Sequence, residues 1–206
     1  MNHRNLKIAL ASAALAVSGA AMADSPQWTY VQGQVGWGDS PDDGENSQYG
    51  GAFSLALFDA MQFGAQYTTG KFDGGGIDDA DVDNWNVNIG LHTAVADNAD
   101  IYADLIYGNI DPDSSIADDD DYYGGRFGFR YLPNDKLEIF GGVQAVKGDD
   151  SEATSVNGWG GGRLFITDAF STGVTFTPDD IRHLEEDSLT IDIRFAFDDQ
   201  SWLGNN

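Results

Sequence analysis

The sequence contains no cysteine and few basic residues: 10 lysines and arginines stand against 34 aspartates and glutamates. Without cysteine, an exported domain of this size must be held together by something other than disulfides. The formal net charge of −24 argues against nucleic acid as a partner, because its phosphates would be repelled. After residue 23 the chain has no apolar run of about 18 residues, so no membrane-spanning helix is expected.

The N-terminus has the three parts of a secretory signal peptide in the usual order. A short basic start precedes a small-residue apolar stretch, and Ala21-Met22-Ala23 matches the cleavage pattern. The apolar stretch is too short to span a bilayer. We therefore expect residues 1–23 to be removed after export and the mature chain to begin at Asp24.

The mature chain is rich in glycine and aromatic residues, and its apolar residues alternate with polar ones. In SLTIDIRFAF, for example, Leu189 and Ile191 share one strand face while Asp192 and Arg194 share the other. Ten segments have this period. The length of each is close to that of a tilted transmembrane strand, which has roughly 9–11 residues. We predict strands at about 28–37, 48–57, 61–69, 84–93, 100–109, 122–132, 137–147, 156–166, 170–177 and 188–197.

The connections between these segments alternate in length and in charge. Short turns such as PNDK separate long connections such as GKFDGGGIDDADVD (70–83), and the long connections hold most of the acidic residues. Short periplasmic turns, long outer loops and an even strand number are typical of outer-membrane barrels. The sequence therefore predicts an all-β fold, a ten-stranded antiparallel transmembrane up-and-down β-barrel over residues 24–197. Residues 198–206 would form a short C-terminal tail.

Aromatic residues fall at the ends of the apolar strand faces. Tyr and Trp concentrate at both membrane–water interfaces, so such residues predict the two aromatic girdles of a membrane barrel. The predicted girdle consists of Trp37, Tyr49, Tyr67, Trp85, Tyr107 and Tyr123 at the outer edge and of Tyr131 and Phe197 at the periplasmic edge. A secreted soluble β-domain is the alternative, but it gives no reason for aromatics at one level.

The opposite strand faces are polar and carry charges of both signs. The predicted lumen charge network consists of Asp104, Arg126, Arg130, Glu138, Arg163, Asp192 and Arg194. The PNDK turn would place Arg130 opposite Glu138. Arg163 would reach Asp192 across small residues of the intervening strand. Long paired side chains mostly fill a barrel of ten strands. The alternative is a charged constriction that selects solutes.

One hairpin carries a family resemblance. The stretch DNWNVNIGLHTAVADNADIYADLIYG (83–108) resembles the hairpin of small proteobacterial outer-membrane barrels, including the diffusible-signal-regulated proteins of xanthomonads. The matching positions are Trp85, Asn86, Gly90, His92, Asp97, Asp100, Tyr102 and Asp104. The resemblance implies a ten-stranded barrel and brings no catalytic residue with it. The terminal strand ending at Phe197 also resembles the signal that outer-membrane assembly machinery recognises, although this chain continues past it.

No motif predicts catalysis, a cofactor or a dedicated metal site. His183 lies among loop acids, as in the rim site of omptin proteases, but those proteins are much longer and no motif matches. Asp79, Asp81 and Asp83 alternate like the start of a calcium loop, without the glycine and glutamate that complete one. Only weak association of Ca²⁺ or Mg²⁺ with the acidic loops is therefore expected.

These observations predict a non-enzymatic, monomeric protein of the Gram-negative outer membrane, with a mostly filled lumen and a part in envelope structure or surface interaction. Its expected partners are membrane lipid, lipopolysaccharide and, during biogenesis, the assembly machinery. Two alternatives are a narrow porin-like channel for small solutes and a rim-located hydrolase.

Overall fold

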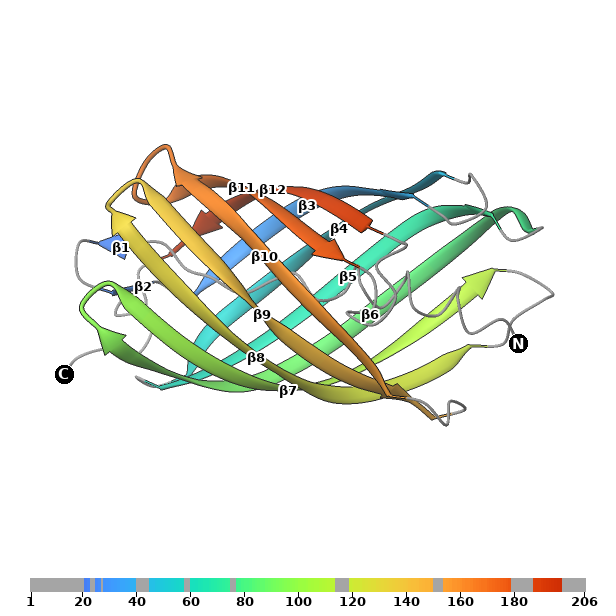
Figure 1. Cartoon of the computed structure of the whole chain (residues 1–206), viewed down its shortest axis with the longest axis horizontal. Helices are drawn as coiled ribbons and strands as arrows, with labels where there is room; N and C mark the ends of the chain where they lie inside the picture. The colour runs from blue at the N-terminus through green and yellow to red at the C-terminus, as the bar shows by residue number, and fades with distance from the viewer. Residues whose placement is uncertain are drawn as a thin grey trace.

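A computed structural model shows the chain as a closed barrel of ten antiparallel strands (Figure 1). The structure describes residues 21–22, 25–26, 28–39, 45–57, 60–74, 77–113, 119–149, 154–178 and 187–197. The barrel strands are β3 (Tyr30–Asp39), β4 (Glu45–Leu57), β5 (Met61–Gly74), β6 (Ile77–Ala96), β7 (Ala99–Asp113), β8 (Asp120–Asn134), β9 (Leu137–Gly148), β10 (Ser155–Phe165), β11 (Phe170–Pro178) and β12 (Asp187–Ala196). Each strand pairs with its sequence neighbours, and β12 pairs with β3 to close the ring. The predicted all-β barrel is confirmed.

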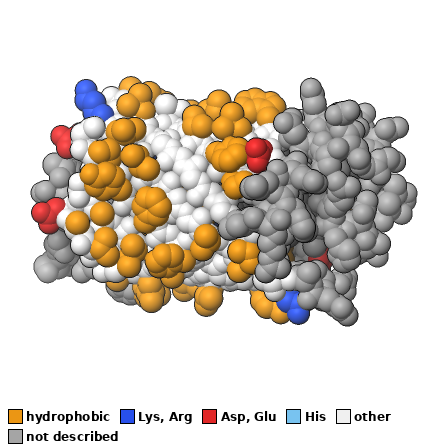
Figure 2. All heavy atoms as spheres, in the orientation of Figure 1, with side chains coloured by type: hydrophobic (Ala, Val, Ile, Leu, Met, Phe, Trp, Pro, Cys, Tyr) orange, Lys and Arg blue, Asp and Glu red, His pale blue; other side chains and the backbone are white. Residues whose placement is uncertain are grey.

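The alternating sequence places apolar side chains on the outside of the barrel and polar ones inside. On β12, Leu189, Ile191 and Ile193 are 39–50% exposed, whereas Asp192 and Arg194 between them are 3% and 1% exposed. In the view of Figure 2 the wall carries mostly hydrophobic and uncharged side chains, and the charged ones lie towards its two ends. A barrel in water would bury the apolar faces, so this inversion is the pattern expected of a barrel in lipid.

Most strands begin and end within a few residues of the predicted bounds, but β5, β6 and β7 are longer. Residues 70–83, predicted as a long outer loop, are mostly strand: Lys71 is paired with Asp81, and Asp81 with Asp113. Acidic residues are typical of loops, which is why the sequence predicts a loop here. Beyond the apolar band, however, a β-ladder faces water on its outside, and acidic side chains are tolerated there.

The register of β8 and β9 differs from the prediction by two residues. Arg130 is paired with Phe140 rather than with Glu138, and the ladder is irregular between Tyr131 and Asn134. The Asn134 side chain accepts a hydrogen bond from the Lys136 N–H (2.9 Å), which fixes a turn centred later than predicted. A shift of two residues preserves the face of every side chain, so the inward set is unchanged.

Two residue pairs near the N-terminus form a small separate sheet, β1 (Ala21–Met22) with β2 (Ser25–Pro26). Cleavage after Ala23 would divide this sheet, and the signal peptide over 1–23 stays a prediction. The predicted tail, 198–206, lies outside the described residues. No helix in the described part of the chain is long and apolar enough to cross a membrane.

Candidate functional site in the barrel lumen

A chain of four charged side chains crosses the lumen in the half nearer the short turns. Glu138 on β9 accepts a hydrogen bond from Arg130 Nε on β8 (2.5 Å) and lies 3.3 Å from an Arg163 nitrogen on β10. Arg163 also reaches Asp192 on β12 (2.7 Å). All four residues are at most 3% exposed. The structure thus joins four of the seven predicted network residues into one chain of ion pairs.

A glycine allows Arg163 to pass over β11. Gly173 on β11 stands between Arg163 and Asp192 in the ladder. A Cβ atom there would lie 3.0 Å from the Arg163 guanidinium and 2.5 Å from the Asp192 carboxylate. Any larger residue at this position would therefore displace the ion pair.

The second ion pair joins neighbouring strands, and a hydrogen bond across a glycine extends it. Asp104 on β7 is directly opposite Arg126 on β8, and their charged groups are 2.6 Å apart. The Gln62 amide on β5 donates to the other Asp104 oxygen (2.7 Å). Gln62 reaches across β6 at Gly90, which pairs with both Gln62 and Asp104. Small inward residues predict the contact of Arg163 with Asp192, and the same signal at Gly90 could have predicted the contact of Gln62 with Asp104.

Arg194, the last predicted network residue, joins the two strands that close the barrel. Its Nε donates to Gln32 on β3 (3.0 Å), and a second guanidinium nitrogen donates to the same oxygen. The guanidinium also lies over the Tyr30 ring, 3.8 Å from its centroid. Tyr30 and Gln32 therefore belong to the network, although its predicted members were charged residues only.

Sequence reasoning missed Trp28, which precedes β3 and lies inside the turn end of the lumen, 3% exposed. Its ring stacks on His92 (4.2 Å between centroids), and the Arg130 guanidinium lies 4.6 Å from it. Trp28 also hydrogen-bonds to Asp100. Trp28 lies two residues before Tyr30, so an extended chain directs both side chains to the same inward face. The sequence alone therefore could have indicated that Trp28 faces the lumen. The ring packs against the Arg130 end of the chain of ion pairs.

The structure places all eight predicted girdle residues on the outer face of the barrel, where they are 41–64% exposed. Within the predicted outer girdle, Tyr67 pairs with Trp85 across β5 and β6, and Tyr107 pairs with Tyr123 across β7 and β8. The rings of Trp85 and Tyr107 also meet edge to face at 5.9 Å. The outer-edge aromatics of these four strands therefore form a continuous arc.

Other predicted features lie on the surface or outside the described residues. His183, several of the acidic loop residues and the side chain of Asp79 are outside the described part of the chain. Asp81 and Asp83 lie on the outer face of β6, beside Asp111 and Asp113 of β7. Among the described residues, no cluster of three or more His, Asp or Glu has the arrangement needed to hold a metal ion.

No family model and no curated protein matches the chain. Among solved structures, the KdgM porin is similar over 82% of this chain and 99% of its own, at 8% identity and a TM-score of 0.48. The translocator domain of autotransporter NalP from Neisseria meningitidis matches 96% of this chain and 95% of its own (11% identity, TM-score 0.49). The outer membrane protein Omp33 of Acinetobacter baumannii matches 83% and 99% (10% identity, TM-score 0.36). These are outer-membrane barrels, but likeness this low identifies no family, and the xanthomonad resemblance stays a prediction.

Proposed function

We propose that the chain is a non-enzymatic barrel of the Gram-negative outer membrane, exported through its N-terminal signal peptide. The exposed apolar faces support this location, because leucine, isoleucine and phenylalanine side chains around a whole ring would otherwise face water. The aromatic residues near both edges of that apolar surface fit the two interfaces of a bilayer. Lipid, lipopolysaccharide and the assembly machinery are the partners implied by this location.

We further propose that side chains close the lumen and that the protein serves envelope structure or surface interaction. The observation that carries this proposal is the buried layer of ion pairs, in which Arg130 and Glu138 are both 0% exposed. Removing one partner from such a buried pair costs about 3–5 kcal/mol, so a passing solute would not readily separate them. The Trp28 ring, over which the Arg130 guanidinium lies, adds to the packing around these ion pairs.

A narrow porin-like channel for small solutes is the second candidate. Several buried polar atoms above the ion pairs lack a protein partner, among them both amide atoms of Gln144, Nδ2 of Asn157 and Oγ1 of Thr190. Buried polar atoms of this kind are commonly satisfied by water. A thread of water along them would give a small conductance without displacing the arginines.

Planar-bilayer recording of the refolded protein separates the two candidates. A closed lumen predicts no steady single-channel steps at either low or high salt, whereas a channel predicts clear steps. Fractionation of cells and the gel migration of boiled and unboiled samples test the location and the closed barrel separately. Recovery of the protein from the soluble periplasm would contradict the proposed location.

The acidic outer surface is proposed to hold divalent cations only weakly. Asp81, Asp83, Asp111 and Asp113 share one surface region, and their mutual repulsion would be relieved by any counterion. Millimolar Ca²⁺ and Mg²⁺ should therefore stabilise the protein about equally, with high NaCl partly replacing both. A tight site selective for Ca²⁺ that survives high salt would contradict this.

A further inference from the structure

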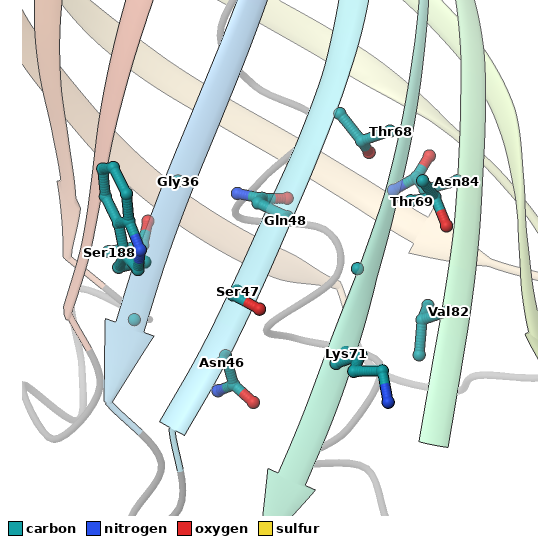
Figure 3. A pocket seen from close by; sticks show the side chains of 13 residues that line it. Gly36, Asn46, Ser47, Gln48, Thr68, Thr69, Lys71, Val82, Asn84 and Ser188 are labelled. Carbon is teal, nitrogen blue, oxygen red and sulfur yellow. The ribbon is translucent and has the colours of Figure 1, made fainter. Parts of the chain in front are cut away.

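The outer half of the lumen contains a small cavity whose inward side chains are uncharged. It has a volume of about 50 Å³ and is lined by residues of β3, β4, β5, β6 and β12 (Figure 3). Its inward polar groups are the amides of Asn46, Gln48 and Asn84 and the hydroxyls of Thr68 and Ser188. Lys71 borders the cavity too, but it is exposed and follows the inward Gly70 on the strand, so its side chain belongs to the outer face.

Asn46 is the polar residue of this wall whose unsatisfied hydrogen bonds indicate a ligand. The residue is 9% exposed, yet neither its Nδ2 nor its Oδ1 has a hydrogen-bond partner in the protein. A primary amide offers two donors and an acceptor, and leaving such a group buried without partners is unfavourable. A molecule in the cavity that both accepts and donates would satisfy it.

Two glycines leave the space that the neighbouring Gln48 side chain occupies. A Cβ atom on Gly36 would lie 2.8 Å from Gln48 Nε2, and one on Gly70 would lie 2.9 Å from Gln48 Cβ. The Gln48 amide therefore occupies the space that Gly36 leaves open, and Figure 3 shows it directed from β4 toward β3. On the opposite side, Asn84 is fixed by the hydrogen bond that its oxygen accepts from Tyr122 (3.0 Å). The cavity wall is thus organised before any ligand arrives.

We propose that this cavity binds a small uncharged polyol, such as the end ring of a neutral saccharide. Neighbouring hydroxyls combine donors and acceptors, as a primary amide does, and the inward side chains of the wall carry no charge to balance an ionic ligand. Val82 and the glycines offer apolar surface to the C–H groups of such a ring. The volume corresponds to only about three to five water molecules, which fits one end of a polyol rather than an oligomer. The ion pairs lie on the turn side of the cavity, so the ligand would enter from the loop side.

Isothermal titration of the refolded full barrel in nanodiscs tests this proposal, with glucose and galactose as neutral probes and glucuronate as the anionic comparison. We expect saturable, weak binding of a neutral hexose and none of glucuronate. Asn46→Leu should weaken the binding at least tenfold. Asn157→Leu is the matched control, because Asn157 is another buried lumen amide but does not line the cavity. The affinity of this variant for the hexose should equal that of the wild type.

Three results would overturn the proposal: no saturable binding of either neutral hexose, binding of glucuronate equal to or tighter than that of the hexoses, or unchanged affinity in Asn46→Leu. If Asn46→Leu does not refold, Asn46→Ala replaces it, because it removes the same amide without adding volume to the cavity wall. Equal hexose affinity in Asn46→Ala would likewise overturn the proposal. Bilayer conductance is measured separately, because a closed lumen and an occupied cavity are independent results.

Discussion

Replacing Glu138 by Gln should destabilise the barrel far more than the small change in shape suggests. The Glu138 carboxylate is completely buried and faces two guanidinium groups, those of Arg130 at 2.5 Å and Arg163 at 3.3 Å. Breaking a buried ion pair by removing one partner costs about 3–5 kcal/mol. Arg163 keeps its second partner, Asp192, and Arg130 keeps the electrostatic attraction of Asp100, which is paired with it across β7 and β8. We therefore expect a loss near the lower end of this range, about 3 kcal/mol.

Urea unfolding of the refolded protein, followed by tryptophan fluorescence, measures this loss. The control is Asp111→Asn, the same type of change on an exposed outer-face residue, which should alter the unfolding free energy by less than about 0.5 kcal/mol. A loss below about 1 kcal/mol for Glu138→Gln would refute the reasoning. It would mean that water already solvates the two arginines, and it would favour the channel over the closed lumen.

Three further predictions concern conduction, the glycine crossings and acid. Replacing both Arg126 and Arg130 by Ser should let water into the lumen and give cation-preferring steps in planar bilayers, because the partner carboxylates remain; a silent double variant would contradict this. Gly173→Ala should destabilise the barrel by about 1–3 kcal/mol in urea unfolding, because the new Cβ would meet the Arg163–Asp192 pair. In the control Gly33→Ala the new Cβ meets only a side-chain atom at 3.8 Å, so the loss should be under about 0.5 kcal/mol. Asp121, on the loop side of the girdle, accepts two side-chain hydrogen bonds that hold its pKa below the usual carboxyl value. Its stabilisation is therefore present above that usual value and lost as the pH falls below it, so Asp121→Asn should reduce the difference between melting temperatures at pH 7 and pH 3.

The strand pattern could be predicted because it depends on local alternation. Each residue of β12 can be assigned to the apolar or the polar face from the sequence. Lipid outside the barrel makes the alternation of apolar and polar residues strict. The same parity assigned Asp104, Glu138 and the arginines to the lumen. Charge was a poorer guide to strand ends, since Asp81 and Asp83 continue a ladder above the apolar band.

Parity and turn position anticipated some contacts in the lumen but not their geometry. Arg130 does meet Glu138, as the sequence predicts, but diagonally, because the turn at Asn134 shifts the β8–β9 register by two residues. Arg163 reaches Asp192 across a strand of small inward residues, also as predicted, and the structure adds that Gly173 is the residue paired with both. Trp28 was overlooked because its importance comes from three different strands that meet around it.

The contact of Arg194 with Gln32 has a consequence for the order of folding. These residues are 162 positions apart, and they meet only when the first and last barrel strands pair. An open sheet that already contained β3 through β11 would have Arg163 without Asp192 and Gln32 without Arg194. Contacts of such high sequence separation form late, after most of the loop-closure entropy has been lost. We therefore expect closure of the barrel and neutralisation of its interior to occur as one cooperative step. Variants of Arg194 should mainly raise the unfolding rate and leave the folding rate nearly unchanged.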